Sequence, residues 1–109
     1  MSPFKPVDWT VGRPASSLII RGIEVSGRFP VEVTIPNAVF YRRDGKQITN
    51  YIVYDDNGRA IKRVDLTGKA HAGIPTPHVV EYRHHLSPDG NIFIKAEKLA
   101  RPATVNEIL

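Results

Sequence analysis

Residues 48–66 read ITNYIVYDDNGRAIKRVDL, and this stretch decides the fold. Two runs rich in branched and aromatic residues, 48–54 and 59–66, flank the segment Asp55-Asp56-Asn57-Gly58. An Asn-Gly pair between two such runs is the strongest short-range signal of a β-hairpin. The stretch therefore predicts two antiparallel strands joined by a tight turn.

Further strands are expected on both sides of this hairpin. HVVEYRHHL (78–86) and NIFIKAE (91–97) flank Ser87-Pro88-Asp89-Gly90, and proline second with glycine fourth suits a type I turn. SLIIRGIEV (17–25) and VEVTI (31–35) are rich in branched residues, which favour strands. These patterns predict a second hairpin after the first and two strands before it.

The expected fold is mainly β, a small twisted antiparallel sheet built from hairpins with little helix. No segment has a sustained 3.6-residue apolar period, so long amphipathic helices are not expected. Arg42-Arg43, before the Asp44-Gly45 turn, are expected in a solvated loop. The length of 109 residues predicts one domain. We expect an N-terminal arm or linker over 1–16 and a single β-rich domain over 17–109.

The composition narrows the classes of function. The chain has no cysteine, which excludes a disulfide scaffold, a thiolate zinc site and a cysteine nucleophile. Its net charge of +4 favours a polyanionic partner. No run approaches the roughly 20 apolar residues that span a bilayer. The N-terminus, MSPFKPVDWTVGRP, lacks the apolar region of a secretory signal. We therefore expect neither membrane insertion nor a signal peptide on this chain.

All four histidines of the chain fall between residues 62 and 85, together with several other chemically active side chains. Metal-free RNA cleavage needs one group that takes a proton from the 2′-hydroxyl, one that gives a proton to the 5′-oxygen, and a cation for the phosphorane. His71 and His78, on either side of the Pro-containing loop 73–77, are candidates for the proton transfers. Arg63 is a candidate for binding the phosphate, with Asp65 orienting an imidazole and Tyr82 stacking or donating its hydroxyl.

Five further residues in this part of the chain are candidates for binding the substrate. They are Lys62, Lys69, Thr76, Arg83 and His84. Each also has an ordinary structural interpretation, as a surface side chain or as one member of a cross-strand pair.

Other classes of function stay open on the residues alone. His71, His78 and either His84 or His85 could assemble a metal site with a carboxylate, although no tight metal-binding spacing is present. A non-catalytic β module that binds a protein or an anionic polymer would use the same charge without turnover. An immunity protein fits the size, but the positive charge argues against it. No nucleotide-binding glycine motif occurs, and no cofactor is expected.

The segment YDDNGRAIKRVDLTGKAHAGIPTPHVVEYRHH (54–85) resembles the C-terminal toxin domains of bacterial polymorphic toxin systems, of the Rhs and contact-dependent-inhibition types. It is similar to a small class of predicted RNases in that group. The positions that carry the similarity are Tyr54-Asp55, Gly58-Arg59, Arg63-Val64-Asp65, His71, Pro77-His78 and Tyr82, and the tail RPAT (101–104) also looks like such domains.

The resemblance implies a metal-independent endoribonuclease that a larger effector delivers into the cytoplasm of a competing bacterium, with transfer RNA as one candidate substrate. It implies a cognate immunity protein as partner. It makes His71 and His78 the acid/base pair, Arg63 the phosphate binder, and Asp65 and Tyr82 supporting residues. Many such toxins have a barnase-like α+β core, which is the alternative to the mainly β fold. The first fifty residues depart from that core, because they contain no convincing helical pattern.

Overall fold

The computed structural model describes residues 3–109 and is mainly β. Residues 1–2 of the expected arm lie outside the described residues. The elements in chain order are β1 (Pro3–Phe4), α1 (Ala15–Ile20), β2 (Ile23–Glu24), β3 (Val39–Asp44), β4 (Gln47–Tyr54), β5 (Ala60–Asp65), β6 (His78–Leu86), β7 (Ile92–Pro102) and the 3₁₀ helix η1 (Val105–Glu107). The prediction of a mainly β fold with little helix is confirmed.

Both predicted hairpins are present. β4 and β5 pair antiparallel around Asn57-Gly58, and Gly58 has φ +75°, a conformation that costs a residue with a Cβ but not glycine. The Asp55 carboxylate accepts hydrogen bonds from the backbone N–H of Asn57 and of Arg59, which fixes the turn. β6 and β7 pair around the turn at Ser87–Gly90. β7 runs to Pro102, further than the predicted end at residue 97.

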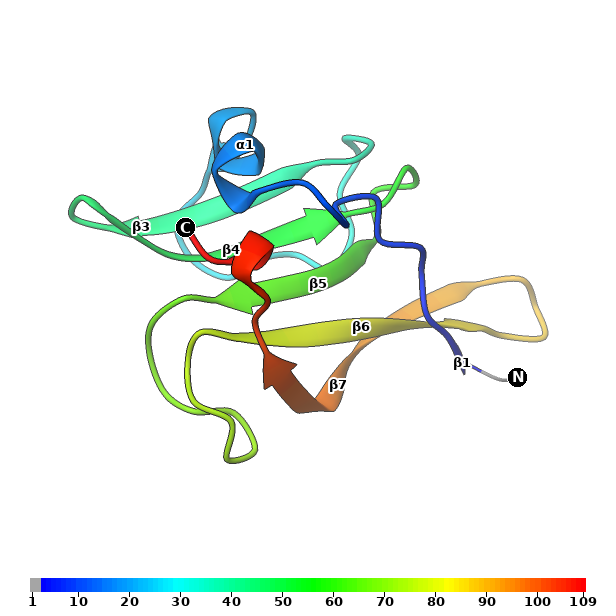
Figure 1. Ribbon diagram of the computed structural model, residues 1–109. Helices are drawn as coiled ribbons and strands as arrows, with labels where there is room; N and C mark the ends of the chain where they lie inside the picture. Colours follow the sequence, from blue (N-terminus) through cyan, green and yellow to red (C-terminus); the bar gives the residue numbers. More distant parts are fainter. Residues whose placement is uncertain (1–2) are drawn as a thin grey trace.

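The strands form one sheet in the order β1-β6-β5-β4-β3-β2. Figure 1 shows β3, β4, β5 and β6 side by side in this order. β1 and β5 share one edge of β6, and β7 pairs along the other edge. β2 pairs parallel with β3, so the sheet is mixed, whereas the sequence predicted an antiparallel sheet. Every other pairing of named strands is antiparallel.

Two of the predicted strands are wrong. Residues 17–25 contain the end of helix α1 and the two-residue strand β2. Ala15 and Leu18, one helical turn apart, are the buried residues of α1, which lies against β3 (Figure 1). The branched residues that suggested a strand therefore sit on a helix, because packing onto the sheet outweighs their local preference. Residues 31–35 keep a single bridge, between Glu32 and Arg59.

The Arg42-Arg43 pair also lies elsewhere than expected. Both residues belong to β3, which forms a hairpin with β4 around Asp44-Gly45-Lys46. A β-bulge falls between Arg42 and Arg43. The expected loop is therefore a strand, and Arg42 projects over the sheet rather than from a turn.

The core has two parts because side chains alternate between the two faces of the sheet. One part joins α1 to the sheet face that it covers, which we call the helix face: Ala15 and Leu18 from α1 pack with Val39, Tyr51, Val53, Ile61, Val64 and Val79. The other part lies on the opposite face, which we call the pocket face: Phe29, Ala38, Ile52, Tyr54, Ala60 and Tyr82. The loop around Phe29 covers part of the pocket face, and the candidate site lies there.

Candidate functional site

A row of four polar side chains crosses the pocket face. The strand register places Arg42 opposite Asn50, Asn50 opposite Asp65, and Asp65 opposite His78, so one residue comes from each of β3 to β6. Arg42 Nε donates to Asn50 Oδ1 at 3.0 Å, and His78 Nε2 lies 2.8 Å from Asp65 Oδ2. Neighbouring strands thus contribute their polar residues at matching positions, and we call these four residues the polar row.

Asp65 is the centre of the polar row. Arg63 donates to both of its carboxylate oxygens, from Nε at 2.9 Å and from Nη2 at 2.9 Å. Burial alone raises the pKa of Asp65, but the hydrogen bonds and charges of Arg63 and His78 outweigh burial and hold this pKa below its usual value. The carboxylate therefore stays ionised and fixes the Arg63 guanidinium in one orientation.

His78 is held from both sides, with 1% of its surface exposed. Its Nδ1 lies 3.0 Å from the carbonyl oxygen of Ile74, and its Nε2 faces Asp65. Both partners only accept hydrogen bonds, so both are satisfied at once only by the doubly protonated ring. His78 is thus an anchored group behind the surface, and its ring nitrogens do not face solvent.

His71 lies beside His78 in the loop between β5 and β6. The two ring centroids are 6.0 Å apart, so the structure brings together the two predicted histidines. His71 and Ile74 close a tight turn through two backbone hydrogen bonds, with Ala72 and Gly73 both at positive φ. The half-buried His71 ring places Nε2 3.0 Å from the carbonyl oxygen of Lys98 on β7. When the proton of the neutral ring is on Nε2, it is donated to that carbonyl oxygen, and the unprotonated Nδ1 can accept a hydrogen bond or a proton.

The same loop carries two of the predicted substrate-binding residues. Lys69 is exposed at the loop surface. Thr76 is half-buried, and its hydroxyl donates to the carbonyl oxygen of Gly68 at 3.4 Å, within the loop. The Lys69 side chain is therefore accessible to a ligand, whereas the Thr76 side chain stabilises the loop.

Next to the polar row is a pocket of about 580 Å³. Three arginines and a tyrosine supply its polar lining, and the full set of lining residues is Gly27, Arg28, Phe29, Val31, Arg42, Arg63, Tyr82 and Ala96. Tyr82 is buried, and burial raises the pKa of its hydroxyl, an effect that the positive charge of neighbouring Arg63 partly offsets. The hydroxyl therefore stays protonated near neutral pH. We call this hollow the arginine pocket.

The comparison with protein families gives a match over most of the chain. Residues 21–108 match the Ntox24 family, described as Bacterial toxin 24. The chain belongs to this bacterial toxin family. No curated protein and no solved structure matches it. The match contains the whole polar row and the arginine pocket, and it begins after α1. Across residues 3–109 of the toxin domain, no helix is long and apolar enough to cross a membrane.

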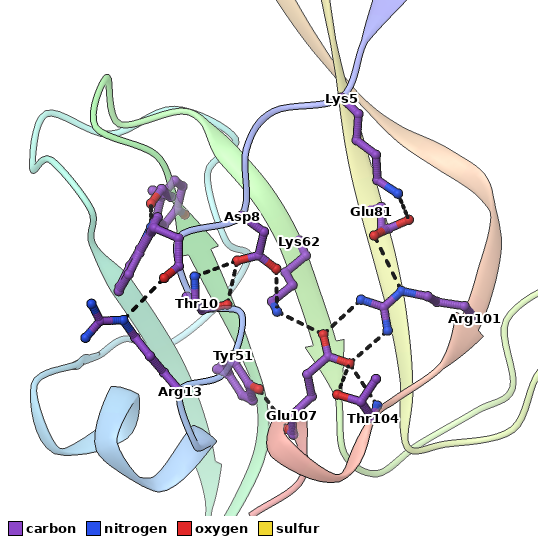
Figure 2. A network of polar contacts seen from close by, with 12 residues as sticks. Lys5, Asp8, Thr10, Arg13, Tyr51, Lys62, Glu81, Arg101, Thr104 and Glu107 are labelled. Carbon is purple, nitrogen blue, oxygen red and sulfur yellow. Dashed lines mark hydrogen bonds and ion pairs between the residues drawn. The ribbon is translucent and has the colours of Figure 1, made fainter.

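Lys62, one of the predicted substrate-binding residues, is buried in the toxin domain. It lies on the helix face, is 4% exposed, and pairs with Asp8 at 2.7 Å and with Glu107 at 2.9 Å. Figure 2 shows Lys62 between these two carboxylates, with Arg101 on the far side of Glu107. The network joins the N-terminal segment and η1 to β5. Lys62 therefore stabilises the fold of the toxin domain and does not face a ligand.

Two further predicted residues have protein partners. His84 is buried, its Nε2 lies 2.9 Å from the carbonyl oxygen of Ala60, and its ring packs edge-on against Phe4. Arg83 lies on the other face of β6 and pairs with Glu97 on β7. Neither residue lines the arginine pocket. Lys62, Arg83 and His84 therefore all have protein partners, and none of them lines the arginine pocket.

Arg28 and Phe29 were missed as site residues, and Arg42 was placed in a solvated loop. Residues 26–30 lie between the two strands expected at 17–25 and 31–35, so only the folded chain shows that this loop crosses the pocket face. The Asp44-Gly45 turn was a usable signal for Arg42, because a turn of this type indicates a hairpin and hence a strand before it. Across residues 3–109, no three His, Asp or Glu side chains lie close enough to hold a metal ion.

Proposed function

We propose that this toxin domain is a metal-independent endoribonuclease that cuts RNA by attack of the 2′-hydroxyl on the adjacent phosphate, leaving a 2′,3′-cyclic phosphate. One observation carries the proposal: Arg63, fixed by Asp65, lies on the pocket face between a pair of histidines and the Tyr82 side chain. Arg63 is opposite Val80 on β6, with His78 two residues to one side and Tyr82 two residues to the other. His71 lies beside His78, with the two ring centroids 6.0 Å apart, and supplies the accessible imidazole on that side.

Arg63 is the group that binds the scissile phosphate. Asp65 engages its Nε and Nη2, which directs the rest of the planar guanidinium outward in a fixed orientation. A guanidinium is always charged and matches the geometry of phosphate oxygens. A fixed cation of this kind stabilises the charge that develops on the phosphorane without having to reorient during the reaction.

His71 is the group that takes the proton from the 2′-hydroxyl. It is more accessible than His78, and its Nδ1 is the nitrogen left to accept a proton when Nε2 serves the Lys98 carbonyl. Imidazole is suited to this step because its unperturbed pKa lies near neutrality. His78 therefore takes a different role from the expected acid/base partner: it positions Asp65, and through Asp65 it positions Arg63.

Tyr82 is the group on the other side of Arg63. Its hydroxyl is protonated at neutral pH and lines the arginine pocket. A hydroxyl there can donate to a phosphate oxygen and then give its proton to the departing 5′-oxygen. In this scheme one proton leaves the 2′-oxygen for His71 and one reaches the 5′-oxygen from Tyr82, so proton loss and gain balance.

The biological setting of the proposal follows from the toxin family. RNA in the cytoplasm of a target bacterium is the substrate, and transfer RNA is one candidate. A larger effector delivers the domain, and a cognate immunity protein neutralises it in the producing cell. The positive charge around the arginine pocket suits an acidic surface on that immunity protein.

The test of the mechanism is RNA cleavage by three variants, each checked for folding by circular dichroism. His71→Ala removes the proposed base, and we expect the rate to fall roughly 10²-fold. Tyr82→Phe removes only the hydroxyl, and we expect a loss of at least roughly tenfold. His85→Ala is the control, because His85 lies on the other face of β6. Full activity in folded His71→Ala protein would contradict the assignment of His71 as the proton acceptor.

A further inference from the structure

The arginine pocket extends beyond the group that holds the scissile phosphate. Arg63 from β5 lines it together with Arg28, from the loop before β3, and Arg42, from β3. Arg42 sits over the Phe29 ring, 4.8 Å from its centroid, so the aromatic ring supports the guanidinium from below. The pocket thus has two cationic groups that the proposed cleavage step does not use.

These guanidinium groups keep donors for a ligand. Arg42 uses Nε for Asn50 and Nη1 for the carbonyl oxygen of Gly27, at 3.0 Å and 2.8 Å, which leaves Nη2. Arg28 forms no hydrogen bond or ion pair with residues 3–109 and is exposed. An exposed arginine with no protein partner, at the rim of a pocket with two others, provides donors for an anion.

The charge balance of the pocket favours a phosphate. Asp65 is the carboxylate of the polar row, and Arg63 already neutralises it. Arg28 and Arg42 therefore leave an excess of positive charge, while Phe29, Val31 and Ala96 give the pocket an apolar side. At about 580 Å³ the pocket lies within the usual range for small-molecule sites, roughly 300–1,000 Å³. Its lining suits one nucleotide, with the phosphate on the arginines.

We infer that Arg28 and Arg42 form a second phosphate subsite, which binds the phosphate next to the scissile one on a single RNA strand. The inference rests on the proposed ribonuclease function, since it defines the neighbouring phosphate by the cleavage step. Two phosphates held on one strand fix the position of the 2′-hydroxyl relative to Arg63, which is the positioning that cleavage requires.

The test measures binding without chemistry. The ligand is a six-nucleotide 2′-O-methyl RNA, which cannot be cleaved because its 2′-oxygens are blocked, and its affinity is measured by calorimetry over a series of salt concentrations. Arg28→Gln is the variant, since Arg28 forms no hydrogen bond or ion pair among residues 3–109. Arg43→Gln is the control with the same change of charge, because Arg43 is exposed and pairs with Glu24 outside the pocket.

We expect Arg28→Gln to bind the oligonucleotide roughly tenfold more weakly than wild type. The slope of log K against log salt should become shallower by about 0.7, the value for one lost contact to a single strand. The Arg43→Gln protein should bind like wild type. Equal affinity of the Arg28→Gln and wild-type proteins overturns the subsite, as does an absence of binding by wild type.

A parallel titration with adenosine 5′-monophosphate separates a strand from a free nucleotide. If the monophosphate binds as tightly as the oligonucleotide, and with the same dependence on Arg28, the pocket holds a free nucleotide and the assignment to a strand is wrong. Cleavage assays decide the proposed function independently. If the protein binds the oligonucleotide through Arg28 but never cuts RNA, Arg28 binds phosphate and the proposed ribonuclease function is wrong. If the protein cuts RNA but the Arg28→Gln variant binds the oligonucleotide as wild type does, the ribonuclease function stands and the second subsite is wrong.

Discussion

The Nε2 atom of His78 lies 2.8 Å from Oδ2 of Asp65, and this contact joins β6 to β5 on the face that carries the arginine pocket. The same carboxylate receives two hydrogen bonds from Arg63. One buried imidazole therefore sets the position of the cation that we assign to the scissile phosphate. The relationship explains how a histidine with 1% exposure acts on the candidate site through Asp65.

Asp65→Asn tests this relationship. An amide keeps the shape of the side chain, but it offers Arg63 one acceptor instead of two and removes the charge that orients both neighbours. We expect RNA cleavage to fall roughly 10²-fold, with the fold retained, as measured by initial rates and circular dichroism. Asp56→Asn, at the exposed tip of the β4–β5 turn, is the control and should cleave normally. Wild-type activity in the Asp65→Asn protein would mean that catalysis does not depend on the orientation that Asp65 gives to Arg63.

The stability of the domain should depend on pH through Glu107. Burial raises the pKa of this carboxyl, but hydrogen bonds from Arg101, Lys62 and the Thr104 backbone outweigh burial and hold its pKa far below the usual 4.5. A lowered folded-state pKa contributes stability that is fully present above pH 4.5 and is lost progressively as the pH falls below that value. Urea unfolding between pH 3 and 7 should therefore give a falling free energy of unfolding at the acid end.

Glu107→Gln identifies the group responsible. The substitution leaves the buried Lys62 ammonium with Asp8 alone, so we expect the free energy of unfolding at pH 7 to drop by about 3 kcal/mol and its acid dependence to weaken. Glu24→Gln removes an exposed pair with Arg43 and should change stability by no more than about 0.5 kcal/mol. If the free energy of unfolding of the Glu107→Gln protein fell with acid as steeply as that of wild type, Glu107 would not be the group responsible.

Gly58→Ala should destabilise the β4–β5 hairpin, which holds the loop around Phe29 over the pocket face. Gly58 has φ +75°, and an added Cβ would lie 1.9 Å from the carbonyl oxygen of Val33. The left-handed conformation alone costs about 1–2 kcal/mol with a Cβ, and the clash adds to it. We expect a loss of about 3 kcal/mol or more in thermal or urea unfolding.

Gly45→Ala separates the cost of the left-handed conformation from the cost of the clash. Gly45 also has positive φ, at +62°, but no atom lies within 4 Å of an added Cβ. Its substitution should cost only the conformational part, about 1–2 kcal/mol. Equal losses for Gly45→Ala and Gly58→Ala would mean that the contact with Val33 contributes nothing.

Local signals predict the hairpins well and the N-terminal half poorly. Asn57-Gly58 and Pro88-Asp89-Gly90 dictate turns through their own backbone preferences, and β6 occupies its predicted range, 78–86. Ile19 and Ile20 favour a strand locally. They nevertheless lie in α1, because the apolar stripe of Ala15 and Leu18 packs on β3. That packing depends on residues far away in the sequence, which a local pattern does not contain.

The candidate site was predicted only where it comes from regular strands. Alternation along β5 and β6 places Arg63, Asp65, His78 and Tyr82 on one face, so their proximity follows from the pairing of two predicted strands. The burial of Lys62 does not follow in this way, because its partners Asp8 and Glu107 come from opposite ends of the chain. The same holds for Arg28, whose loop is placed by tertiary contacts.

The most direct test is incubation of the purified, folded domain with total bacterial RNA, with and without EDTA, followed by a denaturing gel and analysis of the new ends. We predict discrete fragments in both lanes, each ending in a 2′,3′-cyclic phosphate. Cleavage that EDTA abolishes would contradict the metal-independent mechanism. RNA that stays intact in both lanes would contradict the ribonuclease function itself.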